Sequence, residues 1–149
     1  MPNLLSHYLA AGWLTLNWVV GYGVAPVLFS QLNAQVAGSI MAILLSATYW
    51  ADLIVLVLML VVIRQTVKWS KRERWLLVAM VAVVTNLTWV SPLMSELKQI
   101  PETDAAVFGL GFAAWHGVSQ LIFLCAWLSV LLWGLLTVRT GSKAVLHNS

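Results

Sequence analysis

A histidine, a serine and a glutamine stand close together in FAAWHGVSQL (residues 112–121), although the surrounding sequence is almost entirely apolar. Ser119 follows His116 by three positions and Gln120 follows it by four, so on a helix the three side chains share one face. An imidazole at such a place can bind a ligand or transfer protons, or it can hydrogen-bond a nearby backbone carbonyl. The residues alone leave both the functional and the structural role open.

Two prolines fall inside apolar stretches as well, Pro26 in GYGVAPVLF and Pro92 in WVSPLM, where Ser91 precedes the second proline. Each proline lacks a backbone N–H and frees a carbonyl, which needs a new partner in a lipid environment. Both prolines lie near the depth expected for residues 112–121. We therefore predict one polar level, where the histidine stretch satisfies these carbonyls or forms an outward-facing pocket. The residues of this level are His116, Ser119, Gln120, Pro26, Ser91 and Pro92.

A second polar level is predicted nearer the middle of the membrane, where Asn17, Asp52 and Asn86 lie at similar depths. A rise of about 1.5 Å per residue places each of them roughly 16–18 Å from one end of its apolar stretch. An ionised aspartate at that depth costs about 2.5–3.5 kcal/mol, so we expect Asp52 to face the interior, neutral or hydrogen-bonded to the asparagines. Such a cluster is either a clasp between helices or a relay for protons or cations.

Other kinds of site find little support in the sequence. The single cysteine, Cys125, excludes a disulfide within one chain, and no HxxxH, HExxH or CxxC spacing occurs. His7 and His147 are expected on the opposite side of the membrane from His116, so one chain does not supply two histidines to a haem. No serine, histidine and acid share one depth, as nucleophilic catalysis would require. We expect no catalytic residue and no metal site made by one chain, and any cofactor stays unknown.

The elements that must position these residues are four helices that cross a membrane. Of the 149 residues, 61% are hydrophobic and only 9% are charged, and the mean hydropathy is +0.90. A soluble domain has about 25% charged residues, so lipid must cover much of this chain. Four apolar stretches each reach the ~20 residues that a spanning helix needs. They predict an all-α, single-domain four-helix bundle with spans near residues 5–29, 36–63, 75–94 and 105–138, followed by a tail over 139–149.

The basic residues predict how this bundle is oriented. RQTVKWSKRER (residues 64–74) holds five of them and residues 139–149 hold two more, whereas Lys98 is the one basic residue in SELKQIPETD (residues 95–104). Positive charge favours the cytoplasmic side, so we expect both termini there, in a multi-pass protein of the bacterial inner (cytoplasmic) membrane. The expected partner is the lipid bilayer, since basic residues at the ends of apolar stretches indicate orientation rather than nucleic-acid binding.

Several motifs resemble those of a known family. GYGVAPVLFSQL with VAG, then NLTWVSPLMSEL, then FAAWHGVSQL follow one another as in the small four-span proteins of the transmembrane-protein-205-like family, also catalogued as the bacterial domain of unknown function 4149. The resemblance covers nearly the whole chain. The residues that carry it are Pro26, Leu28, Phe29, Ala37, Gly38, Pro92, Phe112, His116 and Ser119.

The resemblance implies a helical inner-membrane protein without an established activity, distantly similar to the copper-resistance D family and to four-helix membrane protoporphyrinogen oxidases. This chain lacks the recurrent histidines of those oxidases, which argues against haem. We therefore expect a non-enzymatic protein that binds or passes a small ligand, or that joins other membrane subunits or a second copy of itself. The alternative is a membrane redox or metal-handling protein, in which His116 binds copper or haem together with another subunit.

Overall fold

The computed structural model describes residues 4–66, 70–99 and 107–146, and these residues are almost entirely helical. The first segment comprises α1 (Leu4–Trp18), the π-helical turn η1 (Val19–Val24) and α2 (Ala25–Gln31); the second is α3 (Ala34–Thr66). The third comprises the short 3-10 turn η2 (Lys71–Glu73), α4 (Arg74–Thr85), the π-helical turn η3 (Asn86–Val90) and α5 (Ser91–Leu97); the fourth is α6 (Phe112–Leu146). The described residues contain no strand beyond one isolated bridge, which confirms the all-α four-helix architecture.

Each segment is long and apolar enough to cross a membrane, over Leu4–Gln31, Ala34–Gln65, Lys71–Leu97 and Phe112–Arg139. The chain is therefore a multi-pass membrane protein. The fourth helix begins later than the predicted residue 105, because Phe108 and Gly109 have positive φ angles of 53° and 73° and form a turn. Residues 105 and 106 lie outside the described residues. At its other end α6 continues to Leu146, so the part of the predicted tail that the structure describes is helical.

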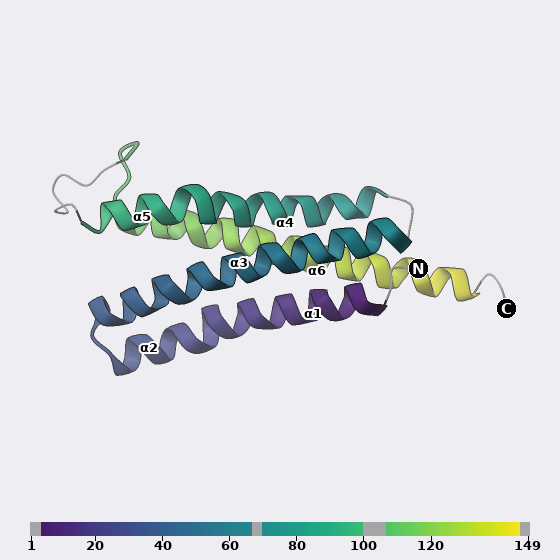
Figure 1. Cartoon of the computed structure of the whole chain (residues 1–149), viewed down its shortest axis with the longest axis horizontal. Coiled ribbons are helices and arrows are strands. Elements are labelled where there is room, and N and C mark those ends of the chain that lie inside the picture. The colour runs from purple at the N-terminus through teal and green to yellow at the C-terminus, as the bar shows by residue number, and fades with distance from the viewer. Residues whose placement is uncertain (1–3, 67–69, 100–106, 147–149) are drawn as a thin grey trace.

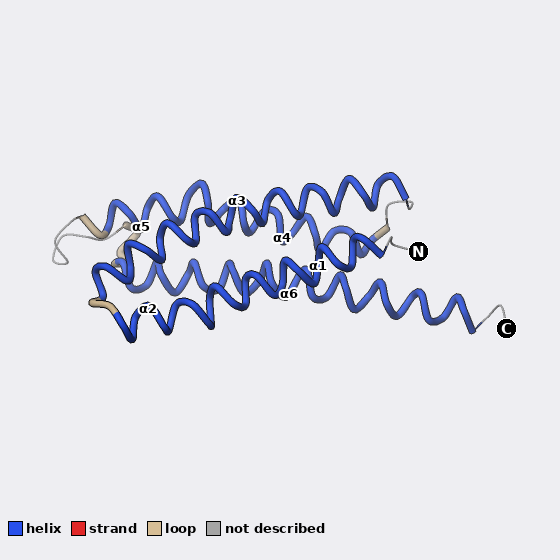
Figure 2. Tube along the Cα trace, turned by 60° about the horizontal axis from the view of Figure 1, so that its bottom comes forward, coloured by secondary structure: helices blue, strands red, loops and turns tan. Residues whose placement is uncertain are grey.

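The four segments run lengthwise beside one another, as both views show (Figures 1 and 2). α1 begins, and α3 and α6 end, at the end of the bundle where η2 lies, and we call this the terminal end. α2 and α5 end, and α3 and α6 begin, at the opposite end, which we call the distal end. Consecutive segments therefore cross the bundle in opposite directions.

The core of the bundle lies mainly in its terminal half. One large cluster of buried apolar side chains draws on all four segments, with Trp13, Leu56, Leu76 and Trp133 among its members. A second, smaller cluster joins α5 to α6 around Trp115. In the distal half, α2 packs on α3 while α5 packs on α6. The distal half thus consists of two helical pairs.

The first and third segments widen into π-helical turns just before their prolines. Pro26 stands in the first turn of α2 and Pro92 in the first turn of α5. The N–H of Ala25 donates to the carbonyl of Val20, five residues back, where an α-helix would bond four residues back. The turn before Pro92 is closed in the same way. The wider turns accommodate the prolines without ending either segment.

The third segment starts with a capping arrangement that the sequence analysis did not single out. Glu73 is buried, and its Oε2 atom accepts the N–H of Ser70 at 2.8 Å as well as the Ser70 hydroxyl. Its Oε1 atom accepts a 3.1 Å hydrogen bond from Nε of Arg72. A serine followed three residues later by a glutamate is the signature of a capping box. Glu73 therefore fixes where the third segment begins.

Candidate ligand-binding site

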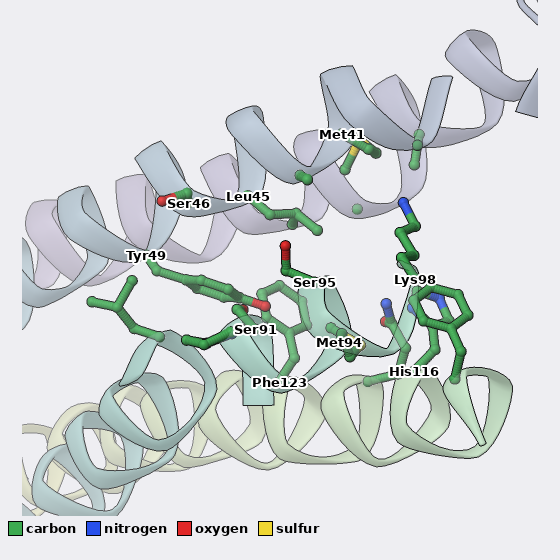
Figure 3. A pocket seen from close by; sticks show the side chains of 18 of the residues that line it. Met41, Leu45, Ser46, Tyr49, Ser91, Met94, Ser95, Lys98, His116 and Phe123 are labelled. Carbon is green, nitrogen blue, oxygen red and sulfur yellow. The ribbon is translucent and has the colours of Figure 1, made fainter. Parts of the chain in front are cut away.

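A cavity of about 760 Å³ lies between the two helical pairs of the distal half. Residues of η1, α2 and α3 line one side, and residues of η3, α5 and α6 line the other. Side chains from α3, α5 and α6 face one another across it (Figure 3). Its volume falls within the range of about 300–1,000 Å³ that is typical of ligand pockets. All four segments thus contribute to one candidate site, which we call the distal cavity.

Four residues of the predicted outer level line this cavity together: His116 and Gln120 on α6, and Ser91 and Pro92 on α5. The imidazole of His116 stacks on the ring of Phe112, with 6.1 Å between the ring centroids and 20° between the planes. In the described part of the chain, the side chains of His116 and Gln120 form no hydrogen bond. Their polar atoms are available to a ligand.

The other two residues of that predicted level lie elsewhere. Ser119 is buried on the core-facing side of α6, where its backbone carbonyl accepts a 3.1 Å hydrogen bond from Nδ2 of Asn86. Pro26 is exposed and does not line the cavity, although the neighbouring Ala25 does. Among the described residues, the side chain of His116 makes no hydrogen bond to a carbonyl freed by a proline. The π-helical turns accommodate the prolines instead.

The predicted mid-membrane residues are all buried, and they form two separate interactions. Nδ2 of Asn17 donates to Oδ1 of Asp52 at 2.8 Å and to the carbonyl of Trp13 at 2.8 Å, which ties α1 to α3. Asn86 binds the carbonyl of Ser119 and so ties η3 to α6. The structure therefore brings Asn17 to Asp52 but gives Asn86 a different partner.

Tyr49 connects this mid-membrane level to the distal cavity. Its side chain lines the cavity and is buried. Asp52 lies one turn further along α3. Oδ2 of Asp52 and the Oδ1 atoms of Asn17 and Asn86 are buried acceptors that have no donor among the described residues. The inner end of the cavity therefore lies next to buried oxygen atoms that can each accept a further hydrogen bond.

Lys98 is the functional candidate that the sequence analysis missed. It is the one charged residue among the described residues that line the distal cavity. In Figure 3 its side chain extends from the end of α5 toward α3. Its Nζ atom lies 3.1 Å from the point where a Cβ would stand on Gly38, and 5.6 Å from the centroid of the Phe112 ring. The signal in the sequence was that Lys98 is the only basic residue on its side of the predicted membrane.

The described residues do not bring two histidines together to bind a haem. His7 lies near the terminal end, where its ring is 5.5 Å from that of Trp133, so it cannot pair with His116. Within the described residues, no three His, Cys, Asp or Glu side chains gather as metal ligands. Softer donors do share the cavity with His116, since Met41 and Met94 line it as well. Thioether and imidazole groups are ligands that suit Cu(I).

Comparison with known proteins identifies a family but no characterised relative. Residues 8–102 match the family described as a domain of unknown function (DUF4149). No curated protein and no solved structure matches the chain. The matched region covers the first three segments and includes Tyr49, Asp52 and Lys98, whereas His116 lies beyond it. Since the match extends over more than half of the sequence, this chain belongs to the DUF4149 family.

Proposed function

We propose that this protein is a non-enzymatic component of the bacterial inner membrane that binds a small ligand in the distal cavity, with His116 as one of its contacts. The observation that carries the proposal is a cavity of about 760 Å³ to which all four segments contribute. Its walls are mostly apolar, while a few polar groups such as His116, Gln120 and Lys98 converge on it. This combination is typical of small-molecule sites.

The proposed orientation puts the terminal end in the cytoplasm. Arg64, Lys71, Arg74 and Arg139 all belong to that end of the helices. Positive charge is retained on the cytoplasmic side during insertion. The distal cavity then occupies the outer half of the membrane, where a ligand enters from the periplasm or from the outer leaflet. The protein acts there as a transport-related or accessory component, alone, as a homo-oligomer or beside other membrane subunits.

A cavity-filling substitution tests the proposal. Ala42 on α3 lines the cavity, whereas Ala47 on the same helix is exposed and does not line it. We expect Ala42→Trp to displace small molecules that co-purify with the protein, and Ala47→Trp to retain them. The measurement is mass spectrometry of organic extracts from the purified proteins. Equal amounts of the same molecules in both variants would contradict a site in the distal cavity.

The second candidate function is copper handling, and one observation favours it. Met41, Met94 and His116 line the same cavity, and together they form a soft donor set. Under this alternative the purified protein contains about one copper per chain, and replacing Met94 by Leu removes it. Metal content measured by mass spectrometry, together with the absorption spectrum, separates the two functions. A colourless sample without copper supports the small-ligand proposal.

A further inference from the structure

We propose that the ligand of the distal cavity is an amphiphile with a single anionic headgroup, a carboxylate or a phosphate monoester, and one long hydrocarbon chain. Lys98 binds the headgroup at the distal end, and the apolar walls hold the chain. This inference rests on the proposed function, because it needs the cavity to be a ligand site. It adds the chemical class of the ligand and the residue that selects it.

The charge of the cavity favours an anionic ligand. Among the described residues that line it, Lys98 is the one that carries a charge, and none is a carboxylate. Within the residues that the structure describes, the recorded ion pair joins Arg72 to Glu73 at the terminal end, and no carboxylate pairs with Lys98. Lys98 is exposed at the end of α5, so an anion can reach its ammonium group. An anionic headgroup at this place would form a charge-assisted hydrogen bond with it.

The ammonium group of Lys98 lies where three segments meet. A lysine near the end of a spanning helix ordinarily extends toward the aqueous interface. The exposed Lys98 reaches from α5 toward α3, where Gly38 has no side chain to occupy the space near Nζ. Phe112 of α6 offers the ammonium its ring face at 5.6 Å. Three segments therefore hold the positive charge at the distal end of the cavity, where His116 and Gln120 add further hydrogen-bonding groups.

The shape and lining of the rest of the cavity suit a hydrocarbon chain. Beyond Lys98 the walls are mainly apolar, with Phe29, Leu45, Leu87 and Phe123 among the lining residues. The lining of α3 extends from Ala34 to Tyr49, a distance of roughly 20 Å along the helix axis. One leaflet of hydrocarbon is about 15 Å thick, so the cavity has the length to take a single lipid-like chain. A charged head at one end and an apolar slot below it match an amphiphile aligned with the membrane normal.

Binding of three probes with the same chain tests the charge requirement. Hexadecanoate, hexadecyl phosphate and hexadecanol are added at equal mole fractions to the full-length protein in micelles of a neutral maltoside detergent, and the thermal-unfolding midpoint is recorded. The two anions should raise the midpoint, whereas hexadecanol should have little effect. Lys98→Gln should weaken binding of the anions by about ten- to a hundred-fold, as expected for a lost hydrogen bond to a charged group. Lys98→Arg keeps the charge and should retain binding.

Lys71 offers a matched control for Lys98. Lys71→Gln makes the same change at the terminal end, outside the cavity, and should bind the anions as the unaltered protein does. A preference for one anion over the other identifies the headgroup and supports the proposal. Equal binding of hexadecanol, or anion binding that survives Lys98→Gln, overturns the anionic ligand while leaving a ligand cavity in place. If none of the three probes binds, the amphiphile is rejected, and the Ala42→Trp extraction then decides whether the proposed function still stands.

Discussion

Asn17 donates a 2.8 Å hydrogen bond to Asp52, and this bond ties α1 to α3 within the buried middle of the bundle. Both side chains are completely buried, and Asp52 has no basic partner among the described residues. In lipid, helices gain little from hydrophobic burial against one another, so a side-chain hydrogen bond contributes directly to their association. The hydrogen bond between Asn17 and Asp52 therefore helps to hold the first two segments together.

We expect Asp52→Leu to lower the free energy of unfolding by about 1–3 kcal/mol, because it leaves the Asn17 amide buried without its acceptor. Asp52→Asn should cost less, since an amide oxygen can still accept the bond. Unfolding in mixed micelles monitored by tryptophan fluorescence measures both variants. Equal tolerance of Leu and Asn would show that the bond between Asn17 and Asp52 does not stabilise the fold.

Glu73 gives a second prediction. Its carboxylate accepts the N–H and hydroxyl of Ser70 and also pairs with Arg72, so Glu73→Ala removes these three side-chain interactions at once. We expect a loss of about 1–2 kcal/mol in the free energy of unfolding. Glu96 is exposed on α5, and Glu96→Ala should change stability by less than about 0.5 kcal/mol. Similar losses in the two variants would show that the capping arrangement at Glu73 does not stabilise the fold.

The architecture followed readily from the sequence because its cause is simple. An apolar stretch of some 20 residues has one stable form in lipid, a helix that satisfies its own backbone. Helix ends depend on local backbone geometry, which composition does not reveal. The positive φ angles of Phe108 and Gly109 delay the start of α6, and nothing in the apolar pattern indicated that.

The candidate site was harder to predict, because it depends on how each helix is rotated. Trp115, Ser119 and Ala126 are buried at helical spacing and define the core-facing stripe of α6. His116 and Gln120 lie at the edge of that stripe and so reach the cavity, while Ser119 does not. The approach of Lys98 to Gly38 depends on how α5 packs against α3. The positions of the two residues in the sequence do not reveal that packing.

Topology is the third prediction. With the terminal end in the cytoplasm, reporters fused after Lys71 and at the C-terminus should give cytoplasmic signals, because basic residues flank those positions. A reporter fused near Pro101, which lies outside the described residues, should be active in the periplasm. Paired fluorescent-protein and alkaline-phosphatase fusions measure this in cells. Phosphatase activity at Lys71 would reverse the orientation and put the distal cavity in the inner half of the membrane.

The last prediction concerns His116. Its imidazole stacks on Phe112, whose ring also faces the ammonium group of Lys98, so the proposal puts the headgroup near His116 as well. His116→Gln replaces this ring by a flexible amide that cannot stack. We expect the variant to fold with nearly unchanged stability, because His116 is exposed and its side chain makes no hydrogen bond in the described part of the chain. The rise in unfolding midpoint on adding hexadecanoate should become smaller, corresponding to about fivefold weaker binding.

His7→Gln is the matched control, since His7 packs on Trp133 at the terminal end, away from the cavity. That variant is expected to lose some stability in the absence of ligand while keeping the full rise on addition of hexadecanoate. The difference between free and ligand-bound midpoints, rather than either midpoint alone, is therefore the quantity to compare. An unchanged difference in His116→Gln would assign His116 to packing against Phe112 and leave recognition of the headgroup to Lys98.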